Sequence, residues 1–258
     1  MNLTLHTYAE QPEVIPLLFS AVKLPAWQYE FMFNDEVANR LWHRLEADFV
    51  DYQFVLRDQD AGGAIAAVGH TLPFQWDATI EDLPDRGWDA IFERAVEGLD
   101  AGRPPNMLTA IEASVAPAYQ GQGVSRRIIE EMRNIARARG FGVLVAPVRP
   151  SLKARYPLTP IDRYVSWTQG AATGDPAAPF DPWLRTHWRM GARIVKVAHN
   201  SMRITGPVAR WERWTGMQFP ESGQYIVPGA LNPVAIDREQ DSGEYIEPNV
   251  WMAHQVSD

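Results

Sequence analysis

The chain has no cysteine among its 258 residues, which excludes disulfides, thiolate metal sites and a cysteine nucleophile. It also lacks any run of about 20 apolar residues, the length that a helix needs to cross a bilayer. The first residues, MNLTLHTYAEQPEV, contain no basic region followed by an apolar segment and therefore do not predict a signal peptide. These absences predict a soluble, cytoplasmic protein without membrane contacts.

Positively charged residues are the minority. The chain has 24 Lys and Arg against 32 Asp and Glu, which gives a formal net charge of −8 at pH 7. Binding to nucleic acid needs a basic surface, so this balance argues against a nucleic-acid partner. With 46% hydrophobic and 22% charged residues, the composition is ordinary for a globular protein.

The spacing of apolar residues predicts one α+β (α/β) domain over residues 1–258, with a mixed, mostly antiparallel central sheet flanked by helices. Residues 147–182 are rich in Pro, Gly and Ala and lack periodicity, which predicts a long active-site segment. Residues 216–258 predict a C-terminal extension with a β-hairpin. Strands are expected at 3–8, 54–57, 64–72, 107–115, 143–148, 194–198, 234–238 and 244–251, and helices at 13–22, 35–49, 88–99, 124–140, 181–190 and 208–214.

The segment 113–140 reads as a strand, a glycine-containing turn and a helix. Such a unit presents backbone N–H groups and the positive end of a helix dipole to an anion. Gly121 and Gly123 meet the requirement for small residues in a turn that surrounds a phosphate. Arg126 and Arg127 follow in the first helical turn, where cations are unfavourable unless a polyanion lies in front of them. The segment therefore predicts a polyanion site.

The context of this turn distinguishes it from other phosphate-binding motifs. A P-loop would need Gly-Lys-Ser/Thr, and a dinucleotide fingerprint would need a third glycine and a ribose-binding acid. Instead Val115, Pro117 and the run Gln120-Gly121-Gln122-Gly123-Val124-Ser125 resemble motif A of the GNAT acyltransferase superfamily, from which Ser125 is a small departure. The expected order of elements over residues 3–197 is similar to the GNAT fold as well.

The resemblance implies a cofactor, acetyl-CoA or another acyl-CoA. Backbone N–H groups of residues 122–126 would hold its pyrophosphate, and its pantetheine would lie alongside the strand that ends at Val115. The implied cofactor-binding residues are Ala113, Val115, Gln120, Gly121, Gln122, Gly123, Val124, Ser125 and Arg126.

A catalytic acid is implied by a second GNAT feature. In many GNAT enzymes a tyrosine four residues before a Gly-Phe pair protonates the departing CoA thiolate. The matching segment here is 187–192, so His187 occupies the tyrosine position. An imidazole near its ordinary pKa can donate or accept a proton at neutral pH, which predicts a general acid. A structural histidine beside the sheet is the alternative interpretation, and Tyr156 is a second candidate acid.

A closer resemblance links the chain to the GNAT-like loading domains of some modular polyketide synthases. Those domains are associated with decarboxylation of malonyl-type thioesters and acyl transfer to a carrier-protein thiol. The resemblance implies His187, Thr159 and Arg203 as catalytic residues, although Thr159 could equally be a turn residue before Pro160. It is carried by the segments 157–160, 181–187 and 201–203.

The sequence thus predicts a GNAT acyltransferase that moves an acetyl group from acetyl-CoA to a small amine or thiol acceptor, with His187 as general acid. The alternatives are a decarboxylase and S-acyltransferase acting on malonyl-CoA, and a non-catalytic acyl-CoA-binding module. The acceptor would be a small molecule or bound to a carrier protein, and the sequence does not define the oligomeric state.

Two groups of polar residues remain. His199 and His254, with Asp237 or Glu247, match no known ligand spacing, so no metal site is predicted. A local basic cluster is either a solvated helix face or a docking surface for CoA phosphates or an acidic carrier protein. The cluster comprises Arg126, Arg127, Arg133, Arg137, Arg139, Arg149, Lys153 and Arg155.

Overall fold

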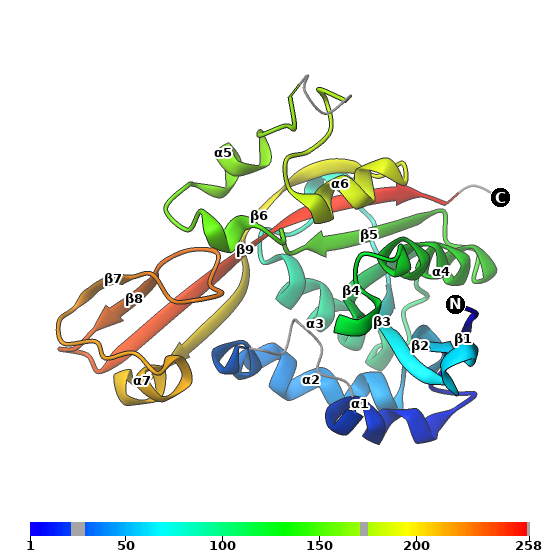
Figure 1. Ribbon diagram of the computed structural model, residues 1–258, viewed down its shortest axis with the longest axis horizontal. Coiled ribbons are helices and arrows are strands. Elements are labelled where there is room, and N and C mark those ends of the chain that lie inside the picture. The colour runs from blue at the N-terminus through cyan, green and yellow to red at the C-terminus, as the bar shows by residue number, and fades with distance from the viewer. Residues whose placement is uncertain (22–28, 171–174, 257–258) are drawn as a thin grey trace.

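A computed structural model describes residues 1–21, 29–170 and 175–256. In these ranges nine strands form one open sheet with the order β1-β2-β3-β4-β5-β9-β8-β7, and β6 also pairs with β9 (Figure 1). The strands are β1 Leu3–Thr7, β2 Gln53–Asp58, β3 Ala64–Phe74, β4 Met107–Val115, β5 Val143–Val148, β6 Arg193–Gly206, β7 Gly223–Tyr225, β8 Val234–Asp237 and β9 Ser242–Gln255. The helices are α1 Ile15–Ala21, α2 Glu36–Ala47, α3 Gly87–Asp100, α4 Val124–Ala138, α5 Ile161–Val165, α6 Pro182–Arg189 and α7 Val208–Thr215.

The sheet is mostly antiparallel, as predicted, and β4–β5 is the parallel pair among the described strands. Helices cover both of its faces. Apolar side chains of α4, such as Ile128 and Met132, pack on one face with Leu108 and Leu144. Side chains of α2 and α3 pack on the other face, where Val145 lies. The alternation of Leu144 and Val145 explains why β5 is apolar throughout, since both its faces are buried. No helix in the described ranges is long and apolar enough to cross a membrane.

The strands β4 and β5 separate soon after they meet. Only Leu108 with Leu144 and Thr109 with Val145 are paired, after which β5 continues its ladder with β9 alone. β4 also carries an extra residue, because His70 pairs with Glu112 while Thr71 pairs with Ala110. Such a bulge shifts the alternation of side chains along the strand. The splayed strands therefore leave a gap in the middle of the sheet, which the functional site occupies.

The C-terminal region differs from the expected hairpin extension. The β8–β9 hairpin exists, but β9 runs far beyond it and lies between β5 and β6 in the centre of the sheet. β6 is likewise much longer than the predicted 194–198, because its outer half pairs with the start of β9. In Figure 1 these two long strands run from the body of the molecule into an arm formed with α7, β7 and β8. The sequence pattern missed this because bulges interrupt the alternation of β6.

The segment 147–182 is more ordered than a loop. It contains the short helix α5 and a cluster of aromatic rings from Tyr156, Tyr164, Trp167 and Phe180, with centroids 5.1 to 6.1 Å apart. Aromatic pairs at such spacings contribute beyond simple burial. Residues 171–174 of the expected segment, and Val22 of the first predicted helix, lie outside the described residues. The remaining predicted helices agree with the structure within a few residues.

Candidate active site

The glycine turn leads into α4 as the sequence predicted. Gly121 and Gly123 have φ of 73° and 83°, a backbone region that residues with a Cβ rarely adopt. The N–H groups of residues 121–125 donate no hydrogen bond to any described residue, so they are available to an external acceptor. The N–H of Arg126, by contrast, donates to the carbonyl of Gly123 at 3.1 Å. The available donors therefore begin and end one residue earlier than predicted.

An open pocket of about 540 Å³ lies in front of this turn. The end of β4, the turn and the start of α4 form one wall, and Ser151 and α6 form the other. Gln122 does not line it, because its side chain donates back to the carbonyl of Ala118 at 2.8 Å. The other predicted cofactor-binding residues do line it: Ala113, Val115, Gln120, Gly121, Gly123, Val124, Ser125 and Arg126.

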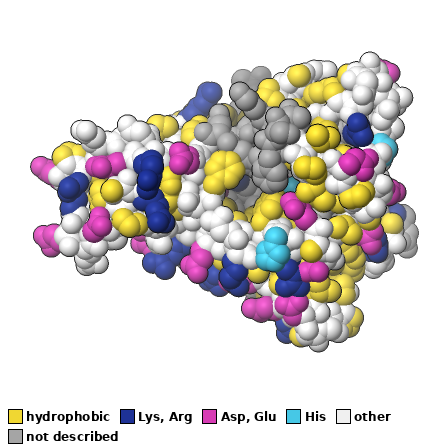
Figure 2. Space-filling view, turned by 90° about the horizontal axis from the view of Figure 1, so that it is seen from below, with side chains coloured by type: hydrophobic (Ala, Val, Ile, Leu, Met, Phe, Trp, Pro, Cys, Tyr) yellow, Lys and Arg dark blue, Asp and Glu magenta, His cyan; other side chains and the backbone are white. Residues whose placement is uncertain are grey.

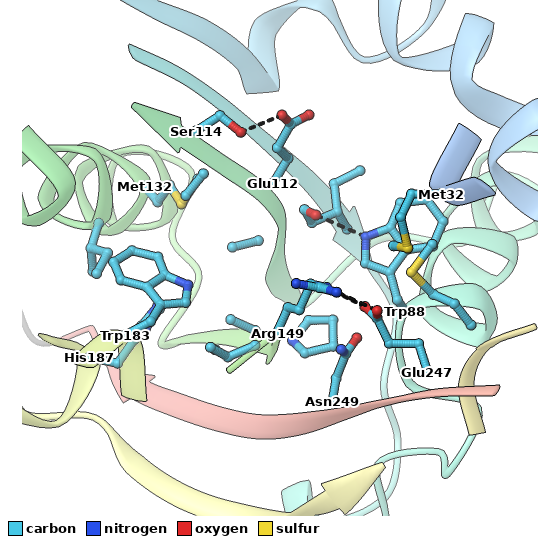
Figure 3. Close-up of a pocket in the computed structure, with 18 residues that line it drawn as sticks. Met32, Trp88, Glu112, Ser114, Met132, Arg149, Trp183, His187, Glu247 and Asn249 are labelled. Carbon is cyan, nitrogen blue, oxygen red and sulfur yellow. Dashed lines mark hydrogen bonds and ion pairs between the residues drawn. The ribbon is translucent and has the colours of Figure 1, made fainter. Parts of the chain in front are cut away.

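A second, deeper cavity of about 180 Å³ fills the gap between β4 and β5 (Figure 3). It adjoins the first pocket, because Ala113, Ser114 and Trp183 line both. Its wall is mainly apolar, with tryptophan and methionine side chains from several elements. The polar groups that reach it are Glu112, Ser114, Arg149, His187, Glu247 and Asn249. A ligand anchored by its phosphates at the turn could thus extend its other end into an enclosed space among these groups.

Glu112 stands at the end of a line of buried polar groups. Its Oε2 lies 2.9 Å from Nδ1 of His70, whose Nε2 lies 2.8 Å from the hydroxyl of Tyr8. Burial, followed by the charge of Glu112, raises the pKa of Tyr8 well above its ordinary value, so this phenol stays protonated. Ser114 donates to the other carboxylate oxygen at 2.6 Å. The result is an oriented carboxylate at the cavity wall.

Sequence reasoning missed Glu112. The bulge at Ile111 places Glu112 and Ser114 on the same side of β4 as Ile111, which packs with α2 and α3. Without the extra residue, the side chain of Glu112 would lie on the face of the sheet that α4 covers. A carboxylate within the otherwise apolar and small residues MLTAIEASV was a usable signal, because a charge is rarely placed in a buried strand without a partner or a function.

His187 lies in the deep cavity, as the proposed role requires, but in a different protonation state from the one expected. It is 4% exposed, and burial lowers its pKa well below the ordinary value, with a smaller contribution from His254. Nδ1 of His187 lies 2.9 Å from Nε2 of His254, whose pKa burial lowers to about 4, helped by the charge of Arg133. Both imidazoles are therefore neutral at pH 7. The premise of an imidazole near its ordinary pKa was wrong.

Helix α6 holds His187 through its N-terminal cap. Asp181 accepts hydrogen bonds from the N–H groups of Trp183 and Leu184, from the hydroxyl of Tyr164 and from the N–H of Leu152. Such a cap satisfies donors that the helix leaves unpaired. Asp181 is thus the N-cap of α6, and it ties this helix to the aromatic cluster through Tyr164.

The other two predicted catalytic residues lie away from the cavities. Arg203 is 67% exposed and pairs with Glu244 at 2.5 Å, because strand alternation turns Met202 toward the cavity and Arg203 away from it. Thr159 lies in a turn, where its N–H donates to the carbonyl of Tyr156 at 3.0 Å, and it lines neither cavity. Tyr156, the second candidate acid, lies in the aromatic cluster.

The basic cluster does not form one surface. Arg127 pairs with Glu131 at 2.5 Å, and Arg139 lies 3.4 Å from Asp51. Arg149 lines the deep cavity and Lys153 is buried. On the face drawn in Figure 2, Lys and Arg side chains are likewise interspersed with Asp and Glu. Of the predicted cluster, Arg126 lines the pocket in front of the turn.

Comparisons with known proteins bear on the fold and the class of this protein. The chain is 31% identical to the arginine N-acetyltransferase avaD of Aspergillus versicolor over 274 residues, which cover 98% of this chain and 94% of that protein. Its structure is similar to the loading GNATL domain of CurA from Lyngbya majuscula, with a TM-score of 0.61 and 17% identity over 99% of this chain and 98% of that one. No family model matches the chain.

The fold and this relative together define the class of protein. The chain belongs to the GNAT acyltransferase family and is an enzyme of the acetyltransferase type.

Proposed function

We propose that this enzyme transfers an acetyl group from acetyl-CoA to an amine of a small acceptor, and that arginine is the first acceptor to test. The observation that carries the proposal is the succession of three features: an anion-binding turn, a pocket in front of it and an adjoining cavity with an oriented carboxylate. Arginine comes from the name of the 31% identical relative, and the carboxylate supplies the proton acceptor that an amine nucleophile needs.

The residues present fit an acyl-CoA. Gly121 and residues 123–126 line the pocket where phosphates would lie, and the N–H groups of residues 121–125 have no partner among the described residues. A Cβ added at Gly121 or Gly123 would meet nothing within 4 Å, so the glycines are required by their backbone conformation and leave the pocket open. When bound, acyl-CoA supplies the activated acetyl group as a thioester.

Glu112 accepts a proton from the amine, directly or through one water, while the amine nitrogen forms its bond to the thioester carbonyl carbon. The carbon–sulfur bond then breaks, and the sulfur leaves as a thiolate. His70 and Tyr8 keep the carboxylate oriented during this step. A neutral His187 is a poor proton donor, so its contribution is a hydrogen bond from its ring N–H to the developing negative charge. This replaces the general-acid role that the sequence predicted.

The experiment is a steady-state assay of Glu112→Gln with acetyl-CoA and arginine, scored by CoA release and product mass. Loss of a general base costs roughly 10²- to 10⁴-fold in kcat. Glu130→Gln, on the exposed face of α4, is the matched control. His187→Gln is expected to lower kcat by about 10-fold or more. It should not remove a titration near pH 6.5 from the pH profile, because the pKa of the wild-type imidazole lies well below its ordinary value. Normal turnover by Glu112→Gln would refute the proposed base.

We favour amine acetylation over the malonyl-CoA decarboxylase alternative, since Thr159 and Arg203 lie outside the cavity that contains His187. A binding module without catalysis would show acetyl-CoA binding by calorimetry and no product with any amine.

A further inference from the structure

The deep cavity has a basic group on the side away from Glu112. Arg149 follows the end of β5, and its guanidinium lies inside the cavity beside Glu247 of β9 (Figure 3). Nε of Arg149 lies 2.9 Å from both carboxylate oxygens of Glu247. Glu247 is 1% exposed, whereas Arg149 keeps 34% of its side chain exposed. The acidic partner of this ion pair is therefore buried, whereas the basic partner stays partly accessible.

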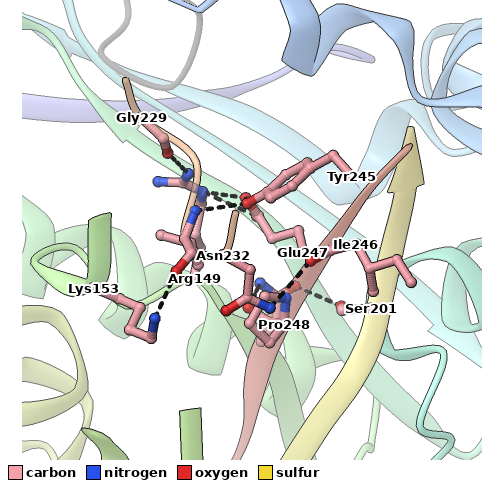
Figure 4. Close-up of polar contacts among 11 residues, drawn as sticks. Arg149, Lys153, Ser201, Gly229, Asn232, Tyr245, Ile246, Glu247 and Pro248 are labelled. Carbon is pink, nitrogen blue, oxygen red and sulfur yellow. Dashed lines mark hydrogen bonds and ion pairs between the residues drawn. The ribbon is translucent and has the colours of Figure 1, made fainter. Parts of the chain in front are cut away.

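The guanidinium is held rigidly by groups from the C-terminal region (Figure 4). One terminal nitrogen, Nη2, donates to the carbonyl of Gly229 at 2.5 Å. The hydroxyl of Tyr245 donates to Glu247 at 2.9 Å and accepts from the N–H of Leu231 at 2.8 Å. A buried lysine, Lys153, donates to the carbonyl of Leu231 at 2.6 Å. Both carbonyls belong to the connection between β7 and β8, which therefore fixes Arg149 in place.

The hydrogen bonds described above do not use every donor of the guanidinium. Arginine carries five N–H donors in a planar fork, and the bonds to Glu247 and Gly229 engage Nε and Nη2. The hydroxyl of Tyr245 interacts with the same guanidinium. Burial opposes the charge of this group, but Glu247 raises its pKa above the ordinary value, so it is charged at all relevant pH values. A charged, fixed donor that faces an apolar cavity is suited to a planar anion such as a carboxylate.

We infer that Arg149 binds the carboxylate of the acceptor, and that the enzyme therefore selects amino acids or other acceptors that carry both an amine and a carboxylate. The inference rests on the proposed function. Glu112 and Arg149 lie on different walls of one cavity, β4 and the end of β5, so an acceptor whose carboxylate pairs with Arg149 has its amine end free to turn toward Glu112. Specificity then comes from a residue that takes no part in the chemistry.

The carboxylate could also come from the acyl donor, as in malonyl-CoA, and the experiment separates the two sources. The first arm compares arginine with agmatine, which is arginine without its carboxylate, using acetyl-CoA as donor. The wild-type enzyme should show a KM for agmatine at least about 10-fold above that for arginine, with a smaller change in kcat, since a hydrogen bond to a charged group is lost. The second arm compares malonyl-CoA with acetyl-CoA at saturating arginine.

Variants assign the effect to Arg149. Replacing Arg149 alone leaves Glu247 buried without its partner, so the variant is Arg149→Met combined with Glu247→Gln, alongside Arg149→Lys, which keeps the charge but loses the planar fork. In the double variant the ratio of the KM for agmatine to that for arginine should fall to about 1, because arginine loses a contact that agmatine never makes. Arg193→Met, which removes another ion-paired arginine from the surface of β6, is the matched control.

Three results would overturn the inference: equal KM values for arginine and agmatine in the wild-type enzyme, variants that weaken both acceptors alike, or variants that change the KM for malonyl-CoA alone. Failure of the proposed function looks different. In that case no amine is acetylated. Calorimetry with CoA present still shows that arginine binds more tightly than agmatine to the wild-type enzyme, whereas the double variant binds the two compounds equally. That result would support the carboxylate site by itself.

Discussion

The two compartments of the site are built in different ways. The wall of the first pocket that carries the turn is made from one continuous stretch, residues 113–126, and its binding groups are backbone N–H groups. The deep cavity is made from side chains that lie far apart in the chain, on β4, β5, α6 and β9. A site made of local backbone leaves a motif in the sequence, whereas a site made of distant side chains depends on how the sheet is assembled. The following changes test this difference between the compartments.

The largest effect is expected from Asp181→Ala, which acts on the cavity side. Loss of the cap and of the acceptor for Tyr164 and Leu152 leaves several buried donors unpaired. We expect a loss of about 3 kcal/mol in the free energy of unfolding, measured by urea denaturation. CoA binding should weaken less than kcat falls. Asp175→Ala, at an exposed turn, is the control, and an unchanged urea midpoint for Asp181→Ala would contradict the role of the cap.

A smaller effect on the free energy of unfolding is expected from a change in pH, through Asp89 of α3. Burial, followed by the charge of Asp35, raises the pKa of Asp89 to about 8. Since this pKa is higher in the folded state than in the unfolded chain, the folded state binds the extra proton, and stability falls as the pH rises. From about pH 6 to about pH 8 the loss should be of order 2 kcal/mol.

The variant Asp89→Asn tests this assignment, because it should flatten the dependence of the urea midpoint on pH. Glu36→Gln, on the exposed start of α2, is the matched control. A wild-type stability that stays level or rises over the same pH interval would contradict the raised pKa.

The smallest effect is expected from Gly123→Val, which acts on the turn. A β-branched residue at a φ of 83° is strained by roughly 1 to 2 kcal/mol, so the KM for acetyl-CoA should rise by about 10-fold while the KM for arginine stays within about 2-fold. Gly142→Ala, at a glycine without positive φ, is the control. Equal changes in both KM values would show that the two compartments are not separable in this way.

The contrast between the compartments also explains what the sequence could predict. The strand, turn and helix of the anion site followed from local spacing, whereas His187 followed from the resemblance to the GNAT family. Glu112 depended on a bulge, and Arg149 depended on β9 lying next to β5, which no local pattern contains. Arg203 was named from the resemblance to the loading domains, and in the structure it lies on the exposed side of β6 beside Glu244.

Trp183 belongs to both compartments, since its indole lines the pocket in front of the turn and the deep cavity alike. Two ligands that share a movable wall do not bind independently. Any rotation of the indole that one ligand favours changes the space offered to the other, and thermodynamic linkage makes the change in affinity equal in the two directions. Trp183, whose ring centroid lies 4.5 Å from that of His187, is therefore the side chain through which we expect donor and acceptor to influence each other's binding.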